Sequence, residues 1–196
     1  YTDDDPANGF IAFDIIKKHY NSPERYDHTY IHPWYYFYDR IIRKIRNLRG
    51  VSDLYDNIPT NENYVYFPLH FEPEFALLAP ASFFTDQIYV IKQVARSLPV
   101  GFKLYVKEHP QMVEFRTRSY YKQLKKIPNV RLVSPTVKGF DVIKNAKLIT
   151  TIAGSSGFEA VLLKKLVITF GEIFYNEAPS VKHCQAIENL PHLVKE

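Results

Sequence analysis

From residue 64 onward, short apolar runs alternate with segments in which apolar residues recur at a helical spacing. The runs are rich in β-branched and aromatic residues and predict strands at 64–69, 103–107, 130–133, 148–152 and 167–170. The helical spacing predicts helices at 83–98, 115–127 and 140–145, and another from Phe158 onward. Strands separated by helices form parallel sheets that are covered on both faces. The pattern therefore predicts an α/β fold with a doubly wound, Rossmann-like sheet.

Residues 1–62 follow a different pattern. Helical spacing predicts one helix at 10–19 and a second at 34–48, which Gly50 ends. The second helix has a basic face, which is typical of a solvated surface and is also compatible with contact with a membrane. We therefore divide the chain into a helical appendage at 1–62 and a Rossmann-like domain at 63–196.

The composition is that of an ordinary globular protein, with 46% hydrophobic and 23% charged residues among 196. The formal net charge of +4 is compatible with an anionic ligand but is too modest to indicate nucleic acid binding. The single cysteine, Cys184, excludes an internal disulfide framework, and no CxxC or HExxH spacing indicates a metal site. There is no membrane-spanning apolar run and no secretory signal. We expect a cytoplasmic protein without a metal, in peripheral contact with the inner membrane if the basic face binds it.

A turn of small residues, A-G-S-S-G at 153–157, separates a predicted strand from a predicted helix. Free N–H groups and the positive end of the helix dipole meet at such a turn, which favours an anion. Gly154 and Gly157 allow a ligand to approach the backbone, while Ser155 and Ser156 add hydroxyl donors. In the alternative interpretation, one of the serines simply caps the helix.

Two earlier strands are followed by residues that can handle protons or phosphates. His70 and Glu74 come after the strand at 64–69 and are candidate catalytic residues, and the alternative interpretation is a surface loop. The strand at 103–107 runs into K-E-H-P, in which Lys107 and His109 share one side of the strand and Pro110 redirects the chain. In doubly wound folds, ligands bind at this carboxyl edge of the sheet.

Three further residues are candidates for sugar contacts. Glu159 lies in the first turn of the helix after the serines, where a carboxylate either caps the helix or accepts hydrogen bonds from ribose hydroxyls. Glu172 and Tyr175 follow the strand at 167–170 in a glycine turn suited to sugar hydroxyls or a ring face. Packing in the core explains Phe174 of the same turn equally well.

The segments 64–74, 104–110 and 150–175 together resemble the bacterial capsule polysaccharide biosynthesis family, which includes Kdo transferases. The most specific motifs are K-E-H-P and G-S-S-G-F-E-A, followed by V-I-T-F-G-E-I-F-Y. The resemblance implies the C-terminal, nucleotide-binding half of a GT-B glycosyltransferase that uses a CMP- or UDP-linked sugar and a glycan or glycolipid acceptor, with no cofactor. Bacterial sialyltransferases are similar in their His-Pro and serine-rich motifs. That similarity implies His109 and Pro110 near the phosphate or ribose, and Ser155 and Ser156 at the phosphate.

The catalytic base of such enzymes usually lies in an N-terminal domain, which residues 1–62 do not resemble. Since the chain also opens on Tyr1, we expect a fragment that is inactive without that domain as its partner. The alternatives are a non-hydrolysing UDP-sugar 2-epimerase, which has a similar K-x-H-P, a phosphotransferase that uses a CDP-alcohol, and a non-catalytic nucleotide- or glycan-binding module. The sequence does not identify the base, sugar, acceptor or oligomeric state.

Overall fold

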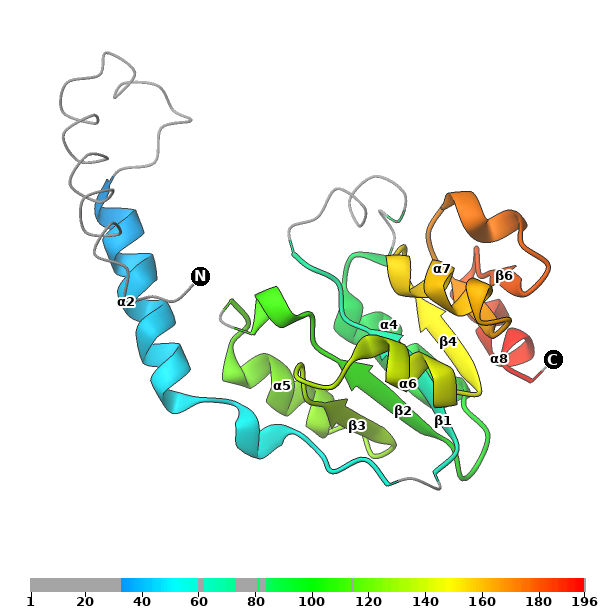
Figure 1. Ribbon diagram of the computed structural model, residues 1–196, viewed down its shortest axis with the longest axis horizontal. Coiled ribbons are helices and arrows are strands. Elements are labelled where there is room, and N and C mark those ends of the chain that lie inside the picture. The colour runs from blue at the N-terminus through cyan, green and yellow to red at the C-terminus, as the bar shows by residue number, and fades with distance from the viewer. Residues whose placement is uncertain (1–32, 60–61, 73–80, 82–83, 114, 196) are drawn as a thin grey trace, which may run out of the picture. The chain divides into compact units, whose positions relative to one another are not determined.

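The computed structural model describes residues 33–59, 62–72, 81, 84–113 and 115–195 (Figure 1). The chain forms two compact units, residues 1–49 and residues 50–196. In the first unit, helix α2 (Pro33–Arg49) confirms the helix predicted at 34–48, and it exposes an apolar stripe that includes Trp34, Tyr38 and Ile41. The helix predicted at 10–19 lies outside the described residues. Within the described ranges, no helix is both long and apolar enough to cross a membrane.

The second unit contains a six-stranded sheet whose paired strands are all parallel, which confirms the predicted doubly wound α/β fold. The strand order is β3-β2-β1-β4-β5-β6. The strands are β1 (Tyr64–Pro68), β2 (Lys103–Lys107), β3 (Val130–Val133), β4 (Leu148–Thr151), β5 (Leu166–Thr169) and β6 (Val181–His183). The sequence pattern missed β6, because three half-buried residues show no hydrophobic period.

The helices of this unit are α4 (Gln87–Ser97), α5 (Arg118–Lys125), α6 (Gly139–Asn145), α7 (Ser155–Leu162) and α8 (Leu190–Leu193). Short 3-10 turns lie at Ser52–Leu54, Pro110–Met112, Phe174–Glu177 and Ile187–Asn189. Helix α4 starts later than predicted, because the side chain of Asp86 accepts the N–H of Tyr89 at 3.0 Å and caps the helix there. Helix α5 likewise starts at Arg118 rather than at 115.

Successive residues of the central strand β1 enter separate cores on the two faces of the sheet. Val65 and Phe67 of β1 belong to the core covered by α4, α5 and α8, while Tyr64 and Tyr66 belong to the core covered by α6 and α7. The segment before β1, predicted as part of the appendage, packs on the first core through Val51. Figure 1 shows the helices on either side of the strands.

Candidate functional site

The order of the strands creates a pocket at the carboxyl edge of the sheet. The chain winds outward in opposite directions from β1 and β4, so the loops that follow these neighbouring strands diverge and leave a crevice. A pocket of about 320 Å³ lies there, between the loops after β1, β2 and β4. Most of the predicted site residues line it: His70, Lys107, His109, Pro110, Gly154, Ser155, Ser156 and Glu159.

Helix α7 presents its N-terminus to the pocket. Gly154 is the N-cap residue, and the helix begins at Ser155, three residues before the predicted start at Phe158. The two serines are therefore first-turn residues rather than caps, and their N–H groups have no acceptor within the helix. The turn is held by the hydroxyl of Tyr175, which donates to the carbonyl of Gly154 at 2.6 Å. A helix N-terminus held in this way favours an anion.

Lys107, the last residue of β2, lines the same pocket and is buried. Its Nζ donates to the carbonyl of Glu108 at 3.4 Å. Burial lowers the pKa of Lys107 because it disfavours the ammonium form, and an anion in the pocket would stabilise that form. The lysine and the N-terminus of α7 thus present positive charge to the same pocket.

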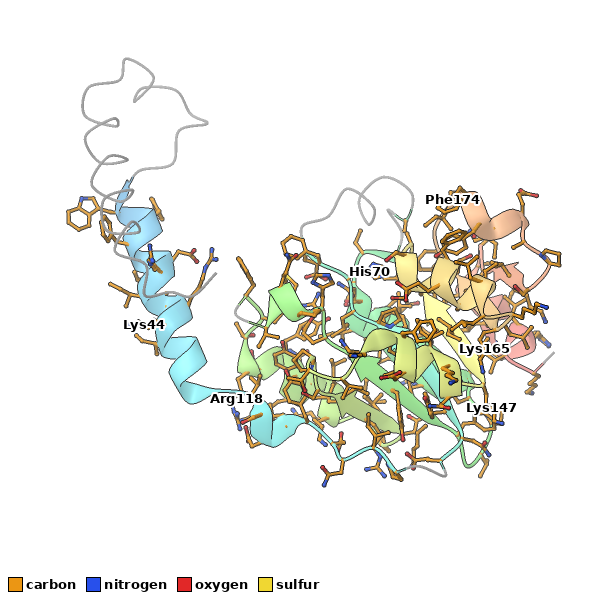
Figure 2. All side chains as sticks on the ribbon, in the orientation of Figure 1. Lys44, His70, Arg118, Lys147, Lys165 and Phe174 are labelled. Atoms are coloured by element: carbon orange, nitrogen blue, oxygen red, sulfur yellow. The ribbon has the colours of Figure 1, made fainter. Side chains whose placement is uncertain are left out.

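His70 lies just beyond Leu69 in the loop after β1 and is buried, and Figure 2 shows it at this edge of the sheet. The N–H of Ile152 donates to Nε2 at 3.3 Å, so in the neutral ring the proton is on Nδ1. Burial, with smaller contributions from the charges of Arg116 and His109, lowers the pKa of His70 to about 4. The imidazole is therefore neutral near pH 7. The predicted catalytic role would require proton transfer through Nδ1, since Nε2 is already engaged.

His109 has the opposite arrangement. Its Nδ1 accepts the N–H of Gln111 at 3.3 Å, so in the neutral ring Nε2 carries the proton and can donate it in a hydrogen bond to a ligand. Pro110 opens the 3-10 turn that supplies this contact and so fixes the direction of the imidazole. The rings of Phe71 and His109 pack in a T-shaped arrangement, with their centroids 6.0 Å apart.

The structure does not bring Gly157, Glu172 or Tyr175 to the pocket. Gly157 is buried, and a Cβ there would lie 2.9 Å from Cγ2 of Thr151 and would also collide with Tyr175. This glycine allows α7 to pack closely, and the Tyr175 hydroxyl supports the turn by donating to the carbonyl of Gly154. Glu172 is 75% exposed and pairs with His183 at 3.7 Å. Glu74 lies outside the described residues.

Packing within the protein requires a glycine at position 154. A Cβ at this position would lie 2.8 Å from Cε1 of His70, so the glycine allows the histidine ring to lie against the turn. Sequence reasoning missed this contact, because the two residues are far apart in the chain. The only available signal was that both follow strands that end at the same edge of the sheet.

Sequence reasoning also missed the buried ion pair of Glu108 and Arg116, beside the pocket. The guanidinium of Arg116 is buried and bonded to the Glu108 carboxylate. Burial raises the pKa of Glu108, and the Arg116 charge opposes this rise. In the described part of the chain, no group of three or more potential ligand residues is placed to hold a metal ion.

The fold is shared with several solved structures at low sequence identity. KpsC, a β-Kdo 2,7 transferase from Thermosulfurimonas dismutans, matches with a TM-score of 0.54 and 17% identity over 79% of this chain and 51% of that chain. MnaA from S. aureus, in a co-structure with UDP, matches with a TM-score of 0.50 and 17% identity over 72% and 39% of the two chains. A UDP-GlcNAc 2-epimerase from Methanocaldococcus jannaschii has the same score with 18% identity over 80% and 44%.

These likenesses define a Rossmann-like domain of the GT-B type, and the chain spans about half the length of the KpsC structure that it matches. No curated protein matches the sequence. The family described as capsule polysaccharide biosynthesis protein matches over residues 12–180. The chain therefore belongs to this family, and the resemblance seen in the sequence motifs is confirmed.

Proposed function

We propose that this chain is the donor-binding half of a glycosyltransferase that builds a bacterial capsule or surface polysaccharide. The observation that carries the proposal is the pocket in which the N-terminus of α7, Lys107 and His109 meet, in a member of a capsule biosynthesis family. The donor is a CMP- or UDP-linked sugar, and the acceptor is a glycan or glycolipid. The UDP in the MnaA co-structure supports a nucleotide ligand for this fold.

Each part of the pocket has a role in the transfer. The bond between the anomeric carbon and the phosphate oxygen breaks, and negative charge develops on the departing phosphate. The N–H and hydroxyl groups of Ser155 and Ser156, together with the ammonium of Lys107, stabilise that charge more strongly in the transition state than in the bound donor. The Nε2–H of His109 donates to the same phosphate or to the ribose.

The other half of the reaction needs groups from outside the pocket. An acceptor hydroxyl oxygen bonds to the anomeric carbon and gives its proton to a base, which we assign to an N-terminal domain of the whole protein. Glu159 accepts hydrogen bonds from the ribose hydroxyls. The chain by itself would bind the nucleotide without turnover, and measured transfer by residues 1–196 would contradict this assignment.

A UDP-sugar 2-epimerase activity is the second candidate. Its support is the similar fold of the M. jannaschii epimerase and the K-E-H-P motif after β2. Incubation with UDP-N-acetylglucosamine, followed by a search for the epimer, separates this activity from transfer. A CDP-alcohol phosphotransferase or a non-catalytic binding module would use the same pocket, and the products formed from CDP-glycerol distinguish between these two.

Nucleotide binding can be tested with two lysines of the same strand. Lys107→Met keeps the length of the side chain and removes the charge in the pocket, whereas Lys103→Met changes the other end of β2. Removing a hydrogen bond to a charged group costs about 1.5–3 kcal/mol, so Lys107→Met should weaken CMP or UDP binding by roughly 10- to 150-fold. Calorimetry should show no change for Lys103→Met. Equal affinities in the two variants would remove Lys107 from the site.

A further inference from the structure

A buried ion pair holds the loop after β2. The side chains of Glu108 and Arg116 are 1% and 4% exposed, and Nη1 of the arginine lies 3.0 Å from both carboxylate oxygens. The hydroxyl of Tyr121 donates to Oε2 at 2.9 Å, and the backbone N–H of His109 donates to Oε1 at 2.6 Å. The carboxylate therefore fixes the backbone from which the His109 imidazole projects.

Arg116 holds the loop after β1 at the same time. Its Nη2 donates to the carbonyl of His70 at 2.6 Å. The side chain of Gln87 binds the same backbone. Its Oε1 accepts the His70 N–H at 2.8 Å, and its Nε2 donates to the His70 carbonyl at 3.3 Å. Glu72 completes the cluster, with its Oε1 3.4 Å from Nη2 of the arginine. The backbone of His70 is thus held by two side chains, one from the first residue of α4 and one from the loop before α5.

The ring of His70 extends this constraint to the loop after β4. It contacts the N–H of Ile152 and the hydroxyl of Thr151, each at 3.3 Å from Nε2, and it lies against Gly154. One network therefore joins the loops after β2, β1 and β4. These are the loops that surround the pocket.

We propose that Glu108 and Arg116 are positioning residues: their ion pair sets His109 and His70 against the N-terminus of α7 without its charged groups touching the ligand. Glu108 borders the pocket, but its carboxylate is buried and fully engaged. A pair this deeply buried adds little net stability over apolar residues of the same shape, because desolvation offsets the attraction. The ion pair instead fixes the positions of the loops that carry His109 and His70. The inference rests on the proposed nucleotide site. Measuring amide exchange beside nucleotide affinity distinguishes a failure of the positioning role from a failure of the proposed function.

Two variants loosen the network to different degrees, and the chain offers a matched control. Arg116→Lys keeps the charge but lacks the planar fork that serves Glu108 and His70 together. Tyr121→Phe removes only the hydroxyl bonded to Glu108. The control is Tyr105→Phe, because Tyr105 is equally buried and its hydroxyl donates to the Glu62 carboxylate at 2.8 Å. Neither Tyr105 nor Glu62 lines the pocket.

The readouts are calorimetric affinity for CMP and UDP, and hydrogen exchange of the Ile152 amide relative to the amides of β4. Ile152 contacts His70 rather than the ion pair, so its exchange reports a change passed through the network. Because the ion pair acts on the pocket through other residues, Arg116→Lys should weaken binding by about 2- to 30-fold and speed the exchange of the Ile152 amide. Tyr121→Phe should also weaken nucleotide binding and speed the Ile152 exchange, but by smaller factors. Tyr105→Phe should leave the affinity and the exchange unchanged.

Unchanged affinity and unchanged Ile152 exchange in Arg116→Lys would overturn the inference, and so would equal effects in Tyr105→Phe. If Arg116→Lys does not fold, the inference is tested by comparing Tyr121→Phe with Tyr105→Phe. Equal affinity and equal Ile152 exchange in these two variants would overturn it. If the wild-type protein binds neither CMP nor UDP, the proposed function fails. The exchange of Ile152 then decides alone whether the ion pair positions the loops.

Discussion

The buried His70 makes the stability of the sheet domain depend on pH. In the unfolded chain this histidine titrates near 6.5, whereas burial lowers its pKa to about 4 in the folded protein. Between these values the unfolded chain binds the extra proton, so the free energy of unfolding falls as the pH falls. The stabilisation is fully present above pH 6.5 and is lost by pH 4. The difference corresponds to about 3 kcal/mol, at ~1.36 kcal/mol per pKa unit.

Other groups titrate in the same range, so the effect must be isolated. Glu108 acts in the opposite direction, because its pKa is raised and the folded state therefore binds its proton first as the pH falls. The comparison of wild type with His70→Gln removes this contribution. Glutamine keeps an acceptor for the Ile152 N–H near the position of Nε2 but does not titrate.

The assay is urea unfolding of both proteins at pH values from 7.5 to 4.5, with His192→Gln as a control at an exposed histidine. Wild type should lose free energy of unfolding relative to His70→Gln as the pH falls, and His192→Gln should follow wild type. Parallel pH dependences of wild type and His70→Gln would show that His70 is not buried in its neutral form, and the argument for its fixed tautomer would fail.

Two further substitutions test where the structure places residues near α7. Gly157→Ala should lower the free energy of unfolding by about 1–3 kcal/mol, because the new Cβ collides with Thr151 and Tyr175. Gly139→Ala is the control in the same denaturation assay, since its Cβ would meet nothing closer than 3.8 Å, and equal losses would contradict the packing argument. Glu172→Gln should leave the calorimetric affinity for CMP- and UDP-linked sugars unchanged, because the carboxylate is exposed outside the pocket. Weaker binding by this variant would instead support the predicted contact between Glu172 and the sugar.

The sequence by itself determined the fold class, because strands and helices leave local hydrophobic patterns. The apolar run of β4 followed by A-G-S-S-G predicted both a strand and an anion-binding turn, and the structure places this turn at the pocket. K-E-H-P could be placed at the same edge because it also follows a strand. Such inferences need only neighbouring residues and the rule that parallel strands end at one edge of the sheet.

Only the tertiary structure decided which side chains meet and in which charge state. Arg116 and His70 are 46 residues apart, and Tyr175 and Gly154 are 21 apart, so no local pattern reveals either bond. The roles of these residues follow from burial and from partners brought close by the strand order. Burial keeps His70 neutral, and Arg116 pairs with Glu108 instead of lining the pocket. Desolvation and hydrogen bonding act through space, and the distances that govern them exist only once the sheet has formed.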